Sequence, residues 1–458
     1  MRATITLSAL VAMASTSVVG LPSTPGHAAE LAVKGAGNVT AAPWTPSLPT
    51  NSPDGRVSEV RQLVQCGSKM YAVGSFSTIV HAGSSYARKN AFSFSASAPG
   101  TPSGWRPNVN GTVNSVALSR DCSVAYLGGT FNSVNGVRVK NIAAVSTVTG
   151  AVLRGFASNA DATVNTVLRV GGHLLVGGAF TTINRSGQDY MVSLNPSTGR
   201  DDGYARLNIS GHYVYTDAGG RASAGNRTRV YNFALSPGGK RLLATGVFTS
   251  VGGQARRQIF MLKLRAGRAA VSRWYSPEFD RNCAVNFPFW LRDASWSPDG
   301  GRIYVATTGY KPATGPGYRI RRQRTGLCDA AAAFDSTNTA GLRHLWVNYT
   351  GCDSLYSTAA GERRVYVGGH ERWASNPRGC DSYLADGATR VDAPGMVGLS
   401  AGTGAVSYNP TRARGRGARD MLLTPFGLWI ASDNAFGANQ CAGESEHAGI
   451  CFVPKAQL

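Results

Sequence analysis

Charged residues, acidic ones above all, are scarce in this sequence, and so is methionine. Only 16% of the 458 residues are charged, 25 residues are Asp or Glu, and 7 are Met. Helical bundles and coiled coils are rich in Glu, Lys, Ala and Leu, so this composition argues against both. Hydrophobic residues nevertheless make up 43% of the chain, which excludes a mainly disordered protein and is enough for a well-buried core.

Several sequence signatures of enzymes and metal sites are also absent. The chain has no Gly-x-Ser-x-Gly elbow, no His-Glu-x-x-His helix, no phosphate-binding loop and no dinucleotide fingerprint. It has no Cys-x-x-Cys pair and only 7 His, none at the helical spacing of metal ligands, so a zinc site is not expected. A glycosidase or polysaccharide lyase stays open, because such enzymes need few residues from scattered parts of a chain.

The first 28 residues have the pattern of a secretory signal peptide. Arg2 supplies a basic start, residues 7–19 are mostly apolar, and residues 26–28 form a small-residue cleavage site. No later apolar run approaches the roughly 20 residues that span a membrane. We therefore expect a signal peptide at 1–28, a single domain at 29–458, and a secreted, extracellular protein without a membrane span.

The remaining charge is strongly basic. Lys and Arg number 46 against 25 acidic residues, which gives a net charge of +21. Most cations are Arg, with local clusters at 319–324 and 412–416. This balance favours anionic partners outside the cell, such as acidic polysaccharides, cell-wall polymers or DNA. The alternative is that a GC-rich genome supplies the Arg residues and the charge only aids solubility.

One pattern of short strands recurs seven times along the chain. Its second strand ends in small residues, and the copies lie at 70–76, 125–131, 174–180, 243–248, 303–308, 365–370 and 428–433. The strands alternate apolar and polar residues and are joined by turns such as residues 297–300 (Ser-Pro-Asp-Gly). A four-stranded unit cannot bury both faces alone, so such units stack radially. The sequence predicts an all-β, seven-bladed β-propeller.

The two ends of the chain appear in this pattern as parts of one copy. Elsewhere a fourth strand follows a Thr-Gly pair, but the last copy stops after its third strand at 447–453. A suitable strand occurs at residues 37–40, before Trp44. We expect this N-terminal strand to complete the seventh blade and close the ring, which protects an open sheet edge. An open solenoid is the alternative, and it would need caps that the sequence lacks.

The repeat has a recognisable core, Val-Gly-Gly-x-Phe-x-x-Val/Ile-x-Gly, seen in residues 128–136 (Gly-Gly-Thr-Phe-Asn-Ser-Val-Asn-Gly). This core resembles the delta-60 type β-propeller repeat of secreted bacterial proteins. Blades two to four match it well, blade one less so, and blades five to seven only in outline. The resemblance implies an architecture and no activity, and no functional residue is carried over from it.

The eight cysteines are an even number, which implies disulfides in an exported chain. Cys283 and Cys352 each precede the innermost strand of a blade, and Cys328 and Cys380 lie in the second-to-third strand connections of the same two blades. This repeated placement predicts the pairs Cys283–Cys328 and Cys352–Cys380. The remaining expected pairs, for which spacing leaves other connectivities open, are Cys66–Cys122, in matching first turns of neighbouring blades, and Cys441–Cys451, across a short loop.

An acidic sector is the first candidate site. Aligning the seven innermost strands places these residues in register: Glu59, Ser115, Thr166, Asn232, Asp293, Asp353 and Asp420. The four carboxylates fall on neighbouring blades, at one side of the predicted channel mouth. They could bind a divalent cation, provide paired carboxylates for acid–base chemistry, or receive a cationic ligand group. Alternatively, they accept backbone hydrogen bonds and pair with Arg292 and Arg419.

A second candidate site lies in blade six, where His370, Glu371, Arg372 and Trp373 replace the usual Gly-x-Phe motif. These side chains could bind a sugar by stacking and hydrogen bonding, with His370 available as a base. The alternative is an ordinary solvated loop. Long connections at 310–329, 374–393 and 436–448 are further prospects, because loops on a rigid scaffold carry recognition.

Cations also occur in the matching connections of blades one to four, namely Arg88, Lys89, Arg138, Lys140, Arg185, Arg256 and Arg257. They could form a basic rim for an acidic polymer, or each Arg could pack against the third strand of its own blade.

Taken together, these features favour a secreted, non-catalytic β-propeller that binds an extracellular carbohydrate or anionic cell-surface polymer. The alternative is a polysaccharide lyase or glycoside hydrolase with a carboxylate or divalent-cation site at the channel mouth. Its catalytic candidates are Asp293, Asp353, Asp420 and His370. A protein–protein scaffold is a third hypothesis.

Overall fold

The computed structural model describes residues 39, 41–51, 55–212, 227–281, 283, 289–309, 326–337, 339–351, 353–379, 390–410, 414–435 and 447–458. All of them belong to one compact unit, residues 32–458. Their regular structure consists of β-strands and short 3-10 helices, η2 (Pro277–Asp280) and η4 (Lys455–Gln457). The all-β prediction is therefore confirmed. Within these ranges, no helix has the length and apolar character needed to cross a membrane.

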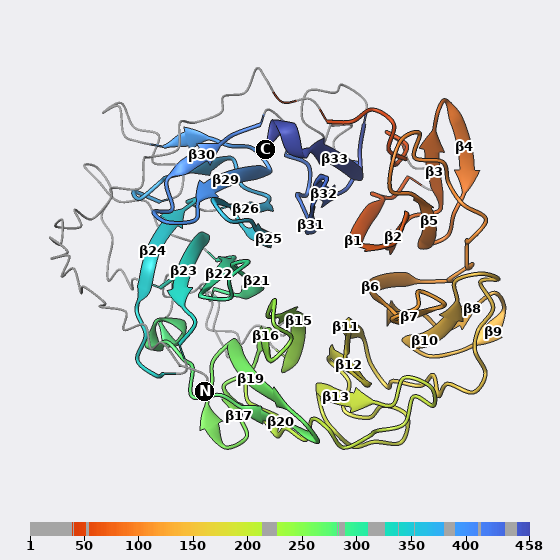
Figure 1. Cartoon of the computed structure of the whole chain (residues 1–458), viewed down its shortest axis with the longest axis horizontal. Helices are drawn as coiled ribbons and strands as arrows, with labels where there is room; N and C mark the ends of the chain where they lie inside the picture. The colour runs from red at the N-terminus through yellow and green to blue at the C-terminus, as the bar shows by residue number, and fades with distance from the viewer. Residues whose placement is uncertain are drawn as a thin grey trace, which may run out of the picture. The chain divides into compact units, whose positions relative to one another are not determined.

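Most strands belong to antiparallel sheets that follow one another along the chain and surround a common centre (Figure 1). Each sheet is named after its first strand. In chain order the sheets contain β1 (Glu59–Cys66), β2 (Lys69–Ser75) and β5 (Ala91–Ser95); β6 (Thr112–Leu118), β7 (Val124–Thr130) and β10 (Ile142–Ser146); β11 (Val164–Val170), β12 (His173–Gly178) and β13 (Met191–Leu194); β15 (Arg229–Leu235), β16 (Arg241–Val247), β19 (Ile259–Arg265) and β20 (Arg268–Val271); β21 (Leu291–Trp296), β22 (Arg302–Thr307), β23 (Ala330–Asp335) and β24 (His344–Tyr349); β25 (Leu355–Ala360), β26 (Arg364–Gly369), β29 (Met396–Ser400) and β30 (Val406–Tyr408); and β31 (Asp420–Thr424), β32 (Gly427–Ala431) and β33 (Ile450–Pro454).

Short β-hairpins lie in the connections between the second and third strands of several sheets. They are formed by β3 (Thr78–His81) with β4 (Ser84–Ala87), β8 (Ser133–Val134) with β9 (Val137–Arg138), β17 (Ser250–Val251) with β18 (Gln254–Ala255), and β27 (Trp373–Ala374) with β28 (Val391–Asp392). A further short strand, β14 (Ile209–Ser210), pairs with β17. In the β1, β6 and β11 sheets, a single bridge takes the place of a regular fourth strand, at Phe94–Pro102, Val145–Val152 and Leu194–Asp201.

The two adjacent glycines of the repeat are each required to avoid a different steric clash, as Gly128 and Gly129 illustrate. A Cβ atom on Gly128 would collide with the Val164 side chain of the next sheet. A Cβ atom on Gly129 would collide with the carbonyl oxygen of Thr112, in the first strand of its own sheet. The first glycine therefore permits close packing between sheets, and the second permits the first strand to cross the second closely.

Every first strand except β31 carries a β-bulge near its start. The register of pairing with the second strand shifts between Val60 and Gln62, Val113 and Ser115, Val164 and Thr166, Val230 and Asn232, Leu291 and Asp293, and Leu355 and Ser357. A bulge inserts one unpaired residue and redirects its side chain. The inserted residues face the centre of the molecule and form the site described below.

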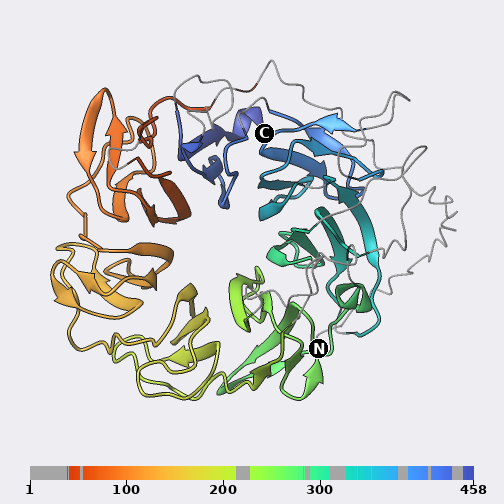
Figure 2. The same cartoon turned by 180° about the vertical axis from the view of Figure 1, so that it is seen from behind.

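The two ends of the described chain lie side by side. The N–H of Ala42 donates to the carbonyl of Phe452 in β33 at 2.7 Å, and Leu48 forms a bridge with Ala448. Of the predicted strand at 37–40, only Val39 is described, and it is buried in the same apolar cluster as Val453. The start of the domain thus packs along its last strand, as Figure 2 shows from behind.

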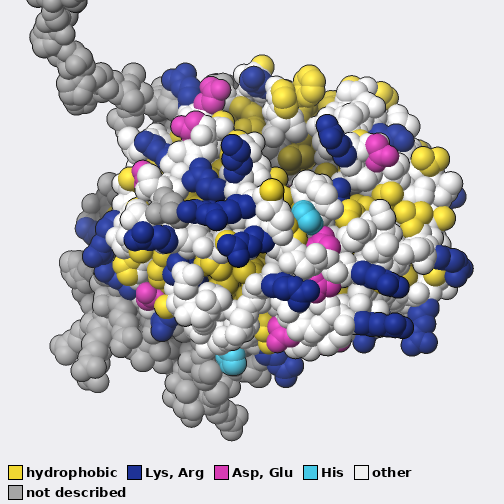
Figure 3. Space-filling model, turned by 60° about the horizontal axis from the view of Figure 1, so that its bottom comes forward, with side chains coloured by type: hydrophobic (Ala, Val, Ile, Leu, Met, Phe, Trp, Pro, Cys, Tyr) yellow, Lys and Arg dark blue, Asp and Glu magenta, His cyan; other side chains and the backbone are white. Residues whose placement is uncertain are grey.

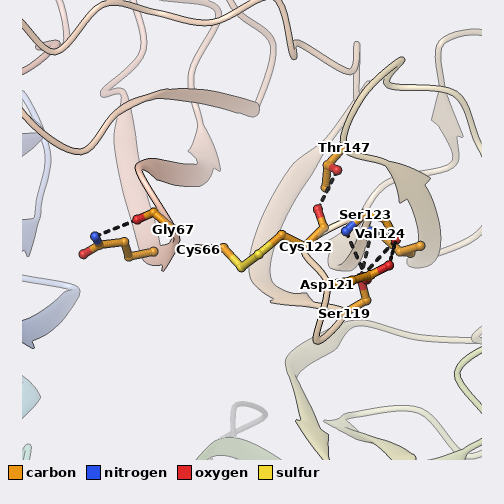
Figure 4. Close-up of a disulfide and its surroundings, with 9 residues drawn as sticks. Cys66, Gly67, Ser119, Asp121, Cys122, Ser123, Val124 and Thr147 are labelled. Carbon is orange, nitrogen blue, oxygen red and sulfur yellow. Dashed lines mark hydrogen bonds between the residues drawn. A yellow bond between two sulfur atoms is a disulfide. The ribbon is translucent and has the colours of Figure 1, made fainter.

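Two of the predicted disulfides are confirmed. Cys66–Cys122 joins the first turns of the β1 and β6 sheets, with Cα atoms 6.1 Å apart. Around it, Asp121 accepts hydrogen bonds from Ser119 and Ser123 (Figure 4). Cys283–Cys328 has a Cα separation of 5.6 Å. Cys352, Cys380 and Cys441 lie outside the described residues, and Cys451, the predicted partner of Cys441, is disulfide-bonded.

Candidate functional site: the mouth of the central channel

The bulge residues of the first strands surround a cavity of about 370 Å³ at the centre of the sheets. Its lining includes the bulge residues Arg61, Asn114, Asn165, Tyr231, Arg292 and Tyr356, together with Arg419, which directly precedes β31. All of these side chains are half-buried. The antiparallel pairing places this end of each first strand beside the end of the second strand, so the cavity opens near the second-to-third strand connections.

Aromatic rings and guanidinium groups alternate along one side of this lining. The guanidinium carbon of Arg292 lies 4.6 Å from the ring centroid of Tyr231 and 5.8 Å from that of Tyr356. The guanidinium carbon of Arg419 lies 4.6 Å from the Tyr356 centroid on the next strand. Such cation–π contacts hold a guanidinium group by its faces and leave the N–H groups at its edges free to bond.

Two of the three cavity arginines share one carboxylate. The Nε atom of Arg61 lies 2.7 Å from Oε2 of Glu59, and the Nε atom of Arg419 pairs with Oε1. Burial of Glu59 alone would raise its pKa, but the charges and hydrogen bonds of Arg419 and Arg61 outweigh this and lower the pKa below its usual value. Glu59 is therefore an ionised, fully paired carboxylate.

Arg292 differs from its neighbours because it has no acidic partner in the described part of the chain. Within the described ranges it forms neither an ion pair nor a side-chain hydrogen bond. Its contacts are the two tyrosine rings. Arg292 is thus a cavity cation whose guanidinium N–H groups bond to no residue that the structure describes.

The residues that follow the bulges accept hydrogen bonds from the backbone of the neighbouring sheet. Oε1 of Gln62 accepts from the N–H of Val116 at 2.7 Å, and Oγ of Ser115 accepts from the N–H of Val167 at 3.1 Å. Between the last and first sheets, Oδ2 of Asp420 accepts from the N–H of Leu63 at 2.9 Å. These bonds run from one first strand to the next and stabilise their contact.

Asp293 has the same role and is more deeply buried than Gln62. Its Oδ1 accepts from Nδ2 of Asn232 at 2.7 Å, and its Oδ2 accepts from the N–H of Thr358 at 2.7 Å. Burial raises the pKa of Asp293 to about 6. Burial, reinforced by the charge of Asp293, raises the pKa of Asp420 to about 7.

The predicted alignment of polar residues is right at some positions and wrong at others. Ser115, Thr166, Asn232 and Asp293 each follow a bulge, and Asp420 begins β31. Glu59 and Asp353 lie earlier, and Gln62 and Ser357 take the equivalent positions. In these two strands the alignment followed a carboxylate near the start, three residues before Gln62 and four residues before Ser357. Among the described residues, no group of three or more His, Cys, Asp or Glu is placed to hold a metal ion.

Asp353 instead joins the second predicted site. Its carboxylate binds Nε of Arg372 at 2.6 Å and Nη2 of Arg414 at 2.9 Å. Nδ1 of His370 lies 2.8 Å from the carbonyl of Gly415. Burial, helped by the charge of Arg414, lowers the pKa of His370, so its imidazole is neutral at neutral pH. The structure therefore brings together residues that the sequence placed in two separate candidate sites.

The aromatic ring of this second cluster is largely covered. Trp373 is 9% exposed, and the guanidinium carbons of Arg372 and Arg390 lie 4.1 Å and 4.5 Å from its ring centroid. Glu371 is fully buried. Little ring face is left for a sugar, so the channel mouth is the better candidate for ligand binding.

The outer cations of the early blades divide into two groups. Arg88 and Arg256 are each 7% exposed; they donate to the carbonyls of Ser103 and Ser272, at 3.4 Å and 2.8 Å, which supports the packing interpretation. Lys89, Arg138, Lys140 and Arg185 are exposed, whereas Arg257 is half-buried and pairs with Asp280. Figure 3 shows Lys and Arg spread over one face with few acidic side chains between them.

The predicted loops are described only in part. Residues 319–324 and most of the connections 310–329, 374–393 and 436–448 lie outside the described residues, as do 411–413. In the described part, sequence reasoning missed the bulge residues. A signal was present, because each directly follows a Val or Leu near the start of its strand, as Asn114 follows Val113 and Arg292 follows Leu291.

Sheets that surround a central cavity, each contributing its first strand to the lining, define a β-propeller (Figure 1). Solved structures similar to this chain include "Structure of U3-55K", at TM-score 0.45 and 10% identity, covering 87% of this chain and 98% of that chain. Another is "Crystal structure of RRP9 WD40 repeats", at TM-score 0.45 and 10% identity, covering 91% and 98%. No protein-family model and no curated protein matches the chain.

Proposed function

We propose that the protein is a secreted, non-catalytic, seven-bladed β-propeller that binds an anionic carbohydrate or cell-surface polymer at its channel mouth. The observation that carries this proposal is the charge of the cavity. Arg61, Arg292 and Arg419 line or border it, whereas Glu59 is the ionised carboxylate among them. Asp420 also lines the cavity, but its pKa of about 7 leaves it partly protonated at neutral pH. A net positive cavity attracts anions.

The neutral part of the lining suits a carbohydrate. Asn114, Asn165, Tyr231 and Tyr356 present amides, hydroxyls and ring faces, which are the groups that bind sugar hydroxyls and the apolar faces of sugar rings. The exposed Lys and Arg of the outer surface add a longer-range attraction for an extended anionic chain.

Contacts around the centre support the seven-bladed, closed arrangement. The first strands β1, β6, β11, β15, β21, β25 and β31 touch in that order, and β31 touches β1. The N–H of Val60 donates to the carbonyl of Ser432 at 2.8 Å, and the segment around Ala42 pairs with β33. Secretion is supported by the disulfides, which persist in oxidising compartments.

Polymer binding at varied salt tests the proposal. The purified protein is passed over immobilised polygalacturonate and, as a matched neutral surface, dextran. We expect binding to polygalacturonate only, weakening steadily between 20 mM and 500 mM NaCl because salt screens the attraction (the screening length falls from roughly 21 Å to roughly 4 Å over this range). Equal binding to dextran, or binding that salt leaves unchanged, would show that the ligand is not recognised by its charge.

The catalytic alternative has one observation in its favour. Asp420 lines the cavity and has a pKa near neutrality, which suits a general acid or base. Incubation with uronate polysaccharides should then release reducing ends or an unsaturated product, and Asp420→Asn should abolish that release. Absence of any product from the native protein removes this alternative and leaves the binding proposal intact.

A further inference from the structure

We propose that Arg292, held between Tyr231 and Tyr356, is a subsite for a single carboxylate, that of a uronic acid residue. This inference rests on the proposed function and specifies its chemistry. The starting point is the contrast among the cavity arginines: two of them share the single carboxylate of Glu59, whereas Arg292 forms no ion pair with any described residue.

The tyrosine rings determine which atoms of Arg292 a ligand can reach. Both rings approach the guanidinium carbon, at 4.6 Å and 5.8 Å, on strands that flank β21. Stacking of this kind restricts the long side chain before any ligand arrives. The uncommitted donors are the N–H groups in the guanidinium plane, which match a planar carboxylate in a two-point contact.

An anion at Arg292 meets no competing carboxylate among the described residues. A ligand carboxylate at Arg61 or Arg419 would have to share its cation with Glu59, which accepts charge-assisted hydrogen bonds from the Nε atoms of both arginines. At Arg292 no described carboxylate shares the guanidinium group. Because one cation is available there, a singly charged carboxylate fits the local charge better than a doubly charged phosphate.

The rest of the cavity has room and partners for the sugar ring. Its volume of about 370 Å³ is at the lower end of the range for small-molecule sites (roughly 300–1,000 Å³). On the opposite side, Nδ2 of Asn165 donates to the carbonyl of Val230 at 2.7 Å. The Oδ1 atom of Asn165 has no partner among the described residues and can accept from a sugar hydroxyl.

Calorimetry with small ligands tests the subsite on the native protein. The probes are digalacturonate, its methyl ester, a neutral galactose disaccharide and inorganic phosphate. We expect digalacturonate to bind and the ester and neutral disaccharide to bind roughly 10- to 100-fold more weakly, the effect of losing a hydrogen bond to a charged group. Ester binding equal to that of the acid, or phosphate binding as tight as the acid, overturns the carboxylate subsite.

Substitutions of Arg292 test whether this residue contacts the ligand carboxylate. Arg292→Gln should weaken digalacturonate binding by roughly the same 10- to 100-fold, and Arg292→Lys should recover little of it, because an ammonium group cannot make the planar two-point contact. The exposed Arg138 provides the matched control, and Arg138→Gln should bind as the native protein does. Unchanged binding by Arg292→Gln overturns the assignment. If a variant does not fold, the ester comparison on the native protein still decides.

The two proposals fail in different ways. If polygalacturonate binds in a salt-dependent manner but digalacturonate shows no preference over its ester, the anionic-polymer function stands and the subsite is wrong. If neither the polymer nor the disaccharide binds, the proposed function itself is wrong.

Discussion

The two sides of the channel mouth use their hydrogen-bonding groups differently. On the β1, β6 and β11 side, Arg61 donates to Asn114, Asn114 donates to the carbonyl of Val164, and Asn165 donates to the carbonyl of Val230. On the β15, β21 and β25 side, Tyr231, Arg292 and Tyr356 meet through ring and guanidinium faces. The first side uses these donors within the protein, whereas the guanidinium donors of Arg292 on the second side have no partner among the described residues.

This contrast shows how one repeated position can serve packing in some sheets and recognition in others. The bulge places its residue toward the centre in every case. An Asn there reaches the backbone of the next sheet and stabilises the contact between them. Tyr231, Arg292 and Tyr356 in the same place instead contact one another through ring and guanidinium faces. Arg61 in the same place bonds to the side chains of Glu59 and Asn114. The chemistry of the site thus depends on which side chain occupies a common backbone position.

The largest expected effect comes from breaking the covalent link on the hydrogen-bonded side. Replacing both Cys66 and Cys122 by Ser removes the disulfide between the β1 and β6 sheets. The free energy of unfolding should fall by about 2–4 kcal/mol, because the unfolded chain regains the freedom that the cross-link removed. Chemical unfolding of the variant and the native protein measures the difference. A variant as stable as the native protein would mean that the other contacts between these sheets suffice.

A smaller effect concerns the buried carboxylates beside the stacked side. Asp420 and Asp293 have folded-state pKa values of about 7 and about 6, above the ordinary value of 3.8. Between pH 4 and these values the folded state keeps protons that the unfolded state has lost, so stability should fall as pH rises from 5 to 7. The slope is at most about 1.4 kcal/mol per pH unit for one proton.

Asp420→Asn isolates this contribution because the amide oxygen can still accept from the N–H of Leu63. Urea unfolding between pH 5 and 8 should show a smaller fall of stability in the variant. The lowered pKa values of His370 and His447 act in the opposite direction at the acidic end, and they are common to both proteins. Parallel pH curves would therefore contradict the raised pKa of Asp420.

The smallest effects on stability are expected from two single substitutions, one on each side of the channel mouth. Asn114→Ala removes hydrogen bonds to Arg61 and Val164 and should cost about 1 kcal/mol of unfolding free energy. Tyr231→Leu removes one ring from Arg292 and should cost about 0.5–1 kcal/mol. Uronate affinity, measured on the same variants, should fall more for Tyr231→Leu. The reverse order of affinity would place the ligand on the hydrogen-bonded side.

Much of the architecture was predictable because it depends on local and repeated patterns. Short alternating strands, turn residues and the Gly-Gly motif predicted the second strands of the sheets, and the placement of the cysteines predicted two of the disulfides, including Cys66–Cys122. The burial of Arg88 was anticipated as one of two interpretations, since its repeat position matches that of Arg256. The same reasoning misplaced Glu59 and Asp353, because it followed carboxylates that lie three and four residues before the positions after the bulges.

The composition, the spacing of the strands and the positions of the cysteines are properties of the chain, and they led to an all-β protein of repeated sheets. The identity of the residues that meet at the centre depends on distances between segments far apart in the chain. Glu59 meets Arg419, and Asp420 meets Leu63, because the first and last sheets come together in space. A local sequence pattern does not predict contacts between such distant segments. The cationic cavity flanked by tyrosines is therefore determined by the tertiary structure.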